Sequence, residues 1–179
     1  MLIYGPPGVG KLAVGRQLAA ATGFRLFHNH LTINAVSALF PRDSEPWTRL
    51  LNRMRREVFA EATRQHLDLI YTSADEPTPE NLEGIRFRLA PVWAGGGSVL
   101  FVQLVCDRPE LMARVQNPDR LEQDKLTDPE VLSNLLSTYD MFKALPFEPL
   151  LRIDSTRLSA GQVAAQIAEH YSLTRPGIR

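Results

Sequence analysis

The chain has 179 residues, and its 20 Lys plus Arg balance its 20 Asp plus Glu, so the formal net charge is zero. Hydrophobic residues make up 44% and charged residues 22%, a composition that is typical of a folded protein and excludes disorder by composition. A neutral chain is not a strongly basic nucleic-acid binder, so we expect no nucleic-acid partner. The length favours one domain, 1–179.

The single cysteine, Cys106, excludes an internal disulfide framework. It ends an apolar run, so we expect it to be a buried small hydrophobe. No apolar run approaches the roughly 20 residues that span a bilayer. The first residues show neither a charged segment nor a cleavage site of a secretory signal. We therefore expect a cytoplasmic protein without a membrane partner.

Strand-like and helix-like segments alternate along the chain. In chain order we expect a strand at 2–4, a helix at 11–21, a strand at 24–27, helices at 31–40 and 46–65, a strand at 67–72, a helix at 82–93, a strand at 99–106, helices at 109–115 and 129–142, a strand at 150–153 and a helix after Ser159. Five strands separated by helices predict a three-layer α/β fold with a parallel sheet and helices on both faces.

The segment after the first strand carries the clearest motif. Its sequence is Gly5-Pro6-Pro7-Gly8-Val9-Gly10-Lys11, which meets the pattern G-x-x-x-x-G-K-[ST] except that Leu12 replaces the hydroxyl residue. Glycines let the backbone approach an anion, and the amides of the loop and of the following helix form a donor nest for phosphates. The motif predicts binding of ATP or a similar nucleotide. The alternative is a Gly/Pro-rich turn with a lysine by chance.

Leu12 affects the expected binding of Mg²⁺. A Ser or Thr at this position normally ligates Mg²⁺, and leucine has no oxygen to offer. The sequence leaves two options. Mg²⁺ is held through waters and another side chain, or the metal site is weakened.

With its strand–loop–helix context, the Gly5–Lys11 motif resembles that of the small P-loop kinase superfamily, which includes shikimate, gluconate and nucleoside-monophosphate kinases. The pairing of G-P-P-G-V-G-K with F-H-N-H is also similar to a set of uncharacterised bacterial kinase-like ATPases. The resemblance implies ATP and Mg²⁺ as cofactors, Lys11 as a catalytic residue, a helical region at about 31–66 that covers an acceptor, and a lid-like segment at about 114–128.

In such kinases an acidic residue at the end of the second strand positions the acceptor hydroxyl. Here that place holds His28-Asn29-His30. The resemblance therefore implies that an imidazole of His28 or His30 replaces the carboxylate, as orienting group or base. Two alternatives stay open. The histidines are hydrogen-bonded structural residues, or their i, i+2 spacing on one strand face binds a metal.

The resemblance assigns three further groups, each with a purely structural alternative. Asp75 would hold a water of Mg²⁺, with Glu76 as a weaker candidate, or be a solvated acid. Arg114 and Arg120 would stabilise the transferring phosphate from the lid, or be solvated loop residues. Asp154-Ser155-Thr156 would line the adenine site, or form a polar turn.

One face of the expected helix 46–65 is polar and basic. It carries Arg49, Arg53, Arg55, Arg56 and Glu57. Three of its arginines suit an anionic acceptor, although a solvated helix face is the common explanation. They are Arg49, Arg53 and Arg56.

These expectations point to an ATP-dependent kinase that transfers the γ-phosphate to a hydroxyl of a small-molecule acceptor. The alternative is a nucleotide-binding regulator or resistance-type protein with slow or no phosphotransfer. Phosphorylation of nucleic-acid ends would need a basic groove, which the neutral composition disfavours. The acceptor cannot be deduced from these residues, and the oligomeric state stays open between monomer and homodimer.

Overall fold

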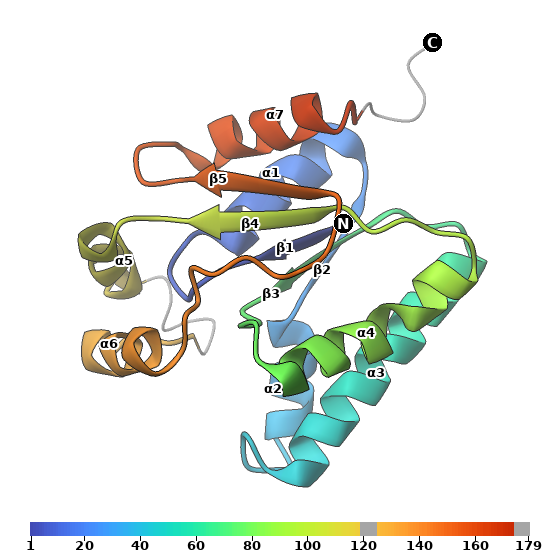
Figure 1. Cartoon of the computed structure of the whole chain (residues 1–179), viewed down its shortest axis with the longest axis horizontal. Coiled ribbons are helices and arrows are strands. Elements are labelled where there is room, and N and C mark those ends of the chain that lie inside the picture. Colours follow the sequence, from blue (N-terminus) through green and yellow to red (C-terminus); the bar gives the residue numbers. More distant parts are fainter. Residues whose placement is uncertain (119–124, 174–179) are drawn as a thin grey trace.

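A computed structural model describes residues 1–118 and 125–173. Its centre is a five-stranded, fully parallel sheet in the order β2-β3-β1-β4-β5 (Figure 1). The strands are β1 (Leu2–Tyr4), β2 (Arg25–His28), β3 (Leu69–Ser73), β4 (Phe101–Val105) and β5 (Leu150–Asp154). The prediction of a parallel α/β sheet is confirmed. β1 lies between strands that are distant in sequence, so the loop that follows it leaves from the middle of the sheet.

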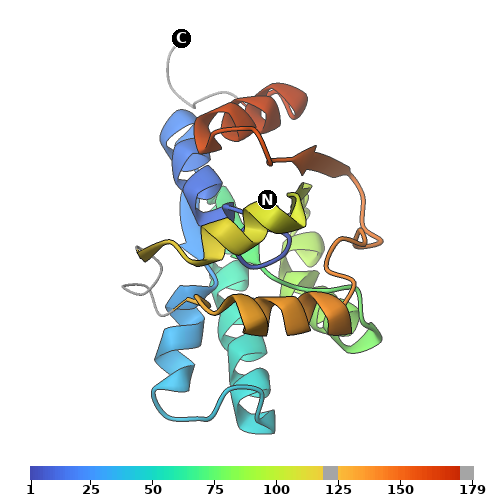
Figure 2. The ribbon, with the colours of Figure 1, turned by 90° about the vertical axis from the view of Figure 1, so that its left-hand side faces the viewer.

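Helices cover both faces of the sheet, which confirms the three layers. The helices are α1 (Lys11–Thr22), α2 (His30–Ser37), α3 (Glu45–Arg64), α4 (Pro79–Ala94), α5 (Arg108–Val115), α6 (Pro129–Thr138) and α7 (Ala160–His170). α1 and α7 pack together on one face, while α3 and α4 lie against the other. α5 and α6 lie beyond the carboxyl ends of the strands and are seen side by side in Figure 2. Within the described residues, no helix is long and apolar enough to cross a membrane.

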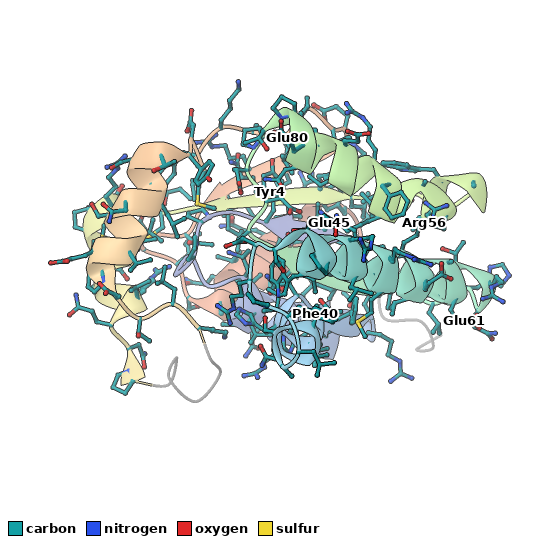
Figure 3. All side chains as sticks on the ribbon, turned by 90° about the horizontal axis from the view of Figure 1, so that it is seen from below. Tyr4, Phe40, Glu45, Arg56, Glu61 and Glu80 are labelled. Atoms are coloured by element: carbon teal, nitrogen blue, oxygen red, sulfur yellow. The ribbon has the colours of Figure 1, made fainter. Side chains whose placement is uncertain are left out.

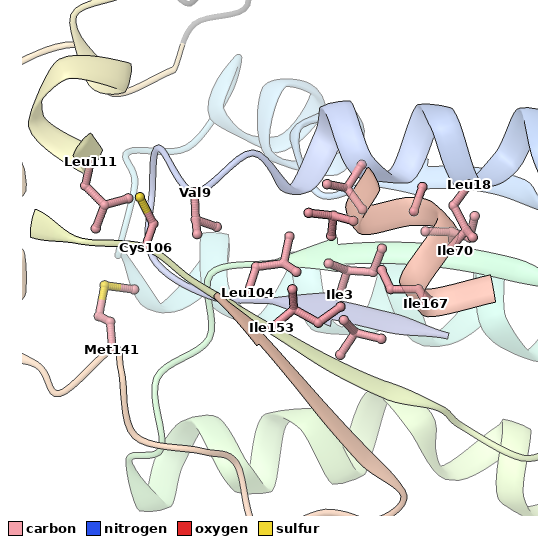
Figure 4. Close-up of a cluster of buried hydrophobic side chains, with 14 of the residues drawn as sticks. Ile3, Val9, Leu18, Ile70, Leu104, Cys106, Leu111, Met141, Ile153 and Ile167 are labelled. Carbon is pink, nitrogen blue, oxygen red and sulfur yellow. The ribbon is translucent and has the colours of Figure 1, made fainter. Parts of the chain in front are cut away.

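Two apolar clusters form the core, one on each side of the sheet. Alternating strand residues divide between them, so that Ile3 faces α1 and α7 while Leu2 and Tyr4 face α3 and α4. The first cluster extends to the carboxyl edge of the sheet, where Cys106 and Leu111 lie beside the loop after β1 (Figure 4). Cys106 is buried, as expected.

Local sequence signals set the limits of several helices. Gly23 ends α1 with φ 80°, and the Ser159 hydroxyl and Gln162 form a capping box at the start of α7. The Thr78 hydroxyl caps α4 by accepting from the Asn81 amide. Pro91 lies inside α4, which continues to Ala94. These capping interactions mark the end of α1 and the starts of α4 and α7.

The structure corrects the extent and face of two predicted helices. α6 ends at Thr138 rather than 142, and two of the large hydrophobic residues in the predicted range, Val131 and Tyr139, are exposed. On α3, Arg55 was placed on the polar face, yet it is only 6% exposed. Arg55 lies one helical step of four residues from both Leu51 and Phe59, so it belongs to the buried stripe of the helix.

Candidate functional site

The loop between β1 and α1 has the geometry of an anion-binding turn. Gly5, Gly8 and Gly10 have φ values of 142°, 90° and 98°, which L side chains rarely adopt. A β-carbon on Gly5 would lie 2.2 Å from the Leu104 carbonyl oxygen of the neighbouring strand. Glycine is therefore required at this position both for its backbone conformation and for space.

The first turn of α1 follows this loop directly. Gly10 is its N-cap, no side chain of the described residues caps the helix, and its first turn holds no acid. Lys11 Nζ donates hydrogen bonds to the carbonyl oxygens of Gly5 at 2.6 Å and Pro6 at 2.8 Å, so the ammonium group lies across the loop. Helix amides, positive dipole and ammonium group together favour an anion here.

A cavity of about 310 Å³ opens over the loop and the start of α1. It is lined by Pro7, Gly8, Gly10, Lys11, Leu12, Ala13, Arg16, Asn29, His30, Thr72, Ala74, Arg114, Asn117 and Lys125. Four of these residues are cationic, and among the described lining residues none is acidic. The electrostatic field of such a wall suits a polyanion.

A second cavity, of about 290 Å³, adjoins the first along α1 and is mostly apolar. It is lined by Val9, Gly10, Ala13, Val14, Arg114, Ser155, Leu158, Ala160 and Val163. Gly10, Ala13 and Arg114 line both cavities. A cationic cavity joined to an apolar one matches a ligand with a phosphate tail and a flat apolar body.

Arg114 lies between the two cavities, at the end of α5. Its Nε donates to Glu110 Oε1 at 2.8 Å, its NH2 donates to the carbonyl oxygens of Ser155 at 2.9 Å and Thr156 at 3.2 Å, and its NH1 contacts Val9 O at 3.4 Å. Arg114 was expected on a lid. In the structure it lies in the last turn of α5 and is hydrogen-bonded to the loop after β1 (Gly5–Gly10, here called the phosphate loop) and to the loop after β5. Its role on a lid stays a prediction.

The loop after β5 is also fixed by hydrogen bonds. The Ser155 amide donates to Val105 O at 2.8 Å, and the Asp107 amide donates to Thr156 Oγ1 at 2.9 Å. Thr156 donates through both its amide and its hydroxyl to Asp154 Oδ1, which lowers the pKa of the Asp154 carboxyl. Of the three residues predicted for the adenine site, Ser155 lines the second cavity, whereas Asp154 and Thr156 support the loop.

The two histidines do not share a strand face. His28 ends β2, whereas His30 begins α2, and their ring centroids are 6.5 Å apart. The i, i+2 strand geometry was therefore wrong, because the chain turns into a helix at Asn29. The described residues also contain no group of three or more metal-ligating side chains.

His30 lines the first cavity, next to Lys11 and Thr72. Burial, followed by the charge of Lys125, lowers the pKa of His30 to about 4, and burial also lowers the pKa of His28. Both Nδ1 atoms are buried, and neither has a hydrogen-bond partner among the described residues. A neutral imidazole at this place can accept a hydrogen bond from a ligand but is a weak base at neutral pH.

The residues near the loop do not fit direct coordination of Mg²⁺. Leu12 offers no oxygen, and the described cavity lining offers no carboxylate. Asp75 Oδ2 already accepts from Ser73 Oγ at 2.7 Å and from Arg88 NH2 at 2.6 Å. The Asp75 carboxylate is therefore already paired with an arginine. Its role toward a metal-bound water stays a prediction.

The exposed arginines of α3 lie outside the lining of the first cavity. Arg49 forms an ion pair with Glu45, and Arg56 donates to Phe87 O at 2.6 Å with its guanidinium carbon 4.7 Å from the centre of the Phe87 ring. Glu45 and Arg56 are labelled on α3 in Figure 3. Neither these residues nor the exposed Arg53 line the first cavity. Arg120 lies outside the described residues, while Lys125 lines the cavity.

No protein-family model matches the chain, and no curated protein matches it in sequence. Solved structures do resemble it along nearly its whole length. A sugar kinase from Janibacter sp. HTCC2649 is 16% identical, with TM-score 0.68, covering 96% of this chain and 93% of its own. A shikimate kinase from Acinetobacter baumannii, in complex with shikimate, is 20% identical with TM-score 0.61, covering 96% and 91%. A tunicamycin resistance protein from Deinococcus radiodurans is 22% identical with TM-score 0.65, covering 99% and 98%.

The chain has the fold of the small P-loop kinases. The segment Gly5–Lys11 follows β1, the central strand of the sheet. The resemblance expected from the motif is thereby confirmed at the level of fold. At sequence identities of 16–22% the similarity shows the fold alone and does not identify the acceptor substrate.

Proposed function

We propose that the protein is an ATP-binding small-molecule kinase that transfers the γ-phosphate to a hydroxyl group of its acceptor. The observation that carries the proposal is the continuity of one cavity. Lys11 and the glycine loop form one wall, and His30 at the start of α2 forms another. A phosphate chain and an acceptor hydroxyl can therefore lie next to each other within one cavity.

The position of each lining residue in the two cavities gives it a role in this reaction. The amides of Gly8–Lys11 and the Lys11 ammonium group hold the β- and γ-phosphates, and Arg16 and Lys125 add positive charge around the transferring group. Arg114 and Ser155 line the second cavity, in which the base of ATP lies. His30, kept neutral by its low pKa, accepts a hydrogen bond from the acceptor hydroxyl and orients it for in-line attack. Arg120 remains a predicted lid residue.

Because the described lining does not fit direct Mg²⁺ ligation, we assign no step to the metal. The charge of the phosphates is met in this scheme by side-chain cations. Mg²⁺ remains a predicted cofactor that would be held through phosphate oxygens and water.

A binding and turnover assay tests the proposal. Calorimetric titration with ATP should show binding that the Lys11→Ala variant weakens by at least about tenfold, which equals about 1.4 kcal/mol. Lys143→Ala is the matched control, because Lys143 is an exposed lysine that does not line the cavity. ADP release is then measured with sugars, polyols and hydroxy acids. Unchanged ATP affinity in Lys11→Ala would place the nucleotide elsewhere.

The second candidate is a nucleotide-binding resistance-type or regulatory protein without efficient phosphotransfer. Leu12 supports it, and the similar tunicamycin resistance protein is compatible with it. ATP binding without ADP formation for any acceptor, with the same affinity in Mg²⁺ and in EDTA, would favour this candidate over the kinase.

A further inference from the structure

Arg114 is the one cationic side chain among the described residues that line the second cavity, and its hydrogen-bonding capacity is already in use. A guanidinium group has five N–H donors. Besides the Nε–H that pairs with Glu110 Oε1 at 2.8 Å, NH2 donates to Ser155 O at 2.9 Å and to Thr156 O at 3.2 Å. NH1 donates at 3.4 Å to both Val9 O and Ser155 Oγ. Five contacts match five donors, so Arg114 has no N–H group left for the edge of a base.

The loop after β5 is used in the same way. The Ser155 amide donates to Val105 O at 2.8 Å, and the Ser155 hydroxyl donates to the same oxygen at 3.1 Å. The Ser155 carbonyl oxygen accepts from Arg114 and, at 3.4 Å, from the Leu158 amide. The Thr156 carbonyl oxygen also accepts from Arg114. The polar groups of Ser155, which lines the cavity, are therefore all engaged within the protein.

The rest of the described wall of the second cavity is apolar. Its side chains are those of Val9, Ala13, Val14, Leu158, Ala160 and Val163, while Gly10 adds only backbone. No carboxylate is among these described lining residues. Ala160 is the first residue of α7, so its amide has no acceptor within the helix. Such a donor does not distinguish the two purines, because adenine offers N1 and guanine offers O6 as an acceptor.

Adenine and guanine differ in the hydrogen bonds that their edges can make. Adenine has an amino group at position 6, where guanine has a carbonyl oxygen, and guanine adds an N1–H and a 2-amino group. A site that hydrogen-bonds one of these groups rejects the other base strongly, because a polar group of the protein is then left unpaired. Stacking and apolar contacts, in contrast, are tolerant of the identity of the base.

We propose that Arg114 makes the nucleotide site insensitive to the identity of the purine, so that the protein binds and uses GTP about as well as ATP. Arg114 occupies the carbonyl oxygens of Ser155 and Thr156, which would otherwise accept from the 6-amino group of adenine and repel O6 of guanine. The base is held instead by apolar contact with residues such as Val14 and Leu158. A pyrimidine buries less area there and binds more weakly. The inference rests on the proposed function, because it assigns the donor class of the same reaction.

Calorimetric titration with ADP, GDP, CDP and UDP as probes gives the first test. The dissociation constants of ADP and GDP should agree within about fivefold, because the described lining reads neither purine edge. CDP and UDP should bind at least about tenfold more weakly than ADP, since the loss of apolar contact with a group as small as a methylene already has an effect of this size. A larger difference between ADP and GDP, in either direction, overturns the proposal. Pyrimidine affinities equal to that of ADP also overturn it, because the base would then not lie in the cavity.

Arg114→Ala tests the cause. The substitution frees the carbonyl oxygens of Ser155 and Thr156, so both affinities should fall and the preference for ADP over GDP should rise by at least about fivefold. Arg108→Ala is the matched control, since Arg108 begins the same helix and lines neither cavity, and it should keep the wild-type ratio. Arg114→Gln, which retains a single amide group, replaces the alanine variant if that variant does not fold. An unchanged ratio of the two affinities overturns the role of Arg114.

The inference and the proposed function fail in different ways. If none of the four nucleotides binds, the proposed function fails and the inference fails with it. If ADP binds and Lys11→Ala weakens its binding, while GDP differs from ADP by more than about fivefold, the nucleotide site stands and only the inference is overturned. Similar binding of ADP and GDP, both weakened by Lys11→Ala, supports both.

Discussion

Arg114 NH2 donates a hydrogen bond of 2.9 Å to the carbonyl oxygen of Ser155, and NH1 of the same guanidinium group contacts Val9 O at 3.4 Å. One side chain from α5 therefore links the loop after β5 to the phosphate loop. These two loops border the apolar cavity that we assign to the base of the nucleotide.

Replacing Arg114 by lysine should weaken nucleotide binding. Lysine keeps the positive charge but cannot reach several carbonyl oxygens with one planar fork. Loss of one or two such hydrogen bonds, each worth about 0.5–1.5 kcal/mol, predicts an affinity for ADP that is lower by about tenfold. Calorimetric titration measures it. Arg108→Lys, on the first turn of the same helix, should leave the affinity unchanged, and an equal loss in both variants would contradict the role of Arg114.

Gly5→Ala should destabilise the fold and abolish nucleotide binding. The new β-carbon would lie 2.2 Å from the Leu104 carbonyl oxygen, and the backbone there has φ 142°. Strain of this kind costs about 1–3 kcal/mol, before any displacement of β4. Urea unfolding provides the measurement.

Gly161→Ala is the control for that substitution, because a β-carbon on Gly161 meets nothing within 4 Å and the residue lies in α7. It should be neutral or stabilising by up to about 1 kcal/mol, since alanine favours helix. Equal stability of the two variants would mean that the phosphate loop is not held against β4.

The free energy of unfolding should depend on pH through His30. Its folded pKa of about 4 lies below its ordinary value of 6.5, so the unfolded chain binds more protons between these values. Stability from this group is therefore present above pH 6.5 and is lost as the pH falls toward 4. His30→Gln should flatten the melting temperature over that window. His66→Gln is the control, and a wild-type slope in His30→Gln would contradict burial of a neutral imidazole.

Leu12→Ser should make nucleotide binding more dependent on Mg²⁺. The hydroxyl would stand where the motif normally supplies a metal ligand, directly after Lys11 in the first turn of α1. The ratio of ATP affinities in Mg²⁺ and in EDTA should rise by several-fold over that of the wild type. Ala20→Ser serves as the control, because Ala20 is an exposed residue of the same helix that lines neither cavity. An unchanged ratio in Leu12→Ser would show that the loop does not place this side chain beside the phosphates.

The fold and the glycine-rich turn at Gly5–Lys11 were predictable because both depend on local patterns. The apolar run that ends at Cys106 indicated a strand, and β4 lies there, between β1 and β5 and with all five residues buried. The spacing of Gly5, Gly10 and Lys11 predicted a turn that the structure shows in its dihedral angles.

The surroundings of Arg55 and the position of His30 were harder to predict, because the residues there meet only through tertiary packing. Arg55 was assigned to the polar face by its charge, although its spacing from Leu51 and Phe59 placed it on the buried one. Its neighbours come from α2, β3 and α4, so no local pattern joins them. His30 was misplaced for a related reason, since a strand and a helix N-terminus are hard to tell apart over three residues.

The placement of β1 between β3 and β4 also affects how the protein unfolds. Its partners begin at Leu69 and Phe101, so the support of the phosphate loop is complete only when more than half of the chain is in place. Loosening at the outer strands would spare the loop, whereas separating its own strand requires opening the sheet through its middle. A nucleotide bound there would therefore protect the whole sheet against denaturation, and proteolysis of the entire chain should slow in its presence.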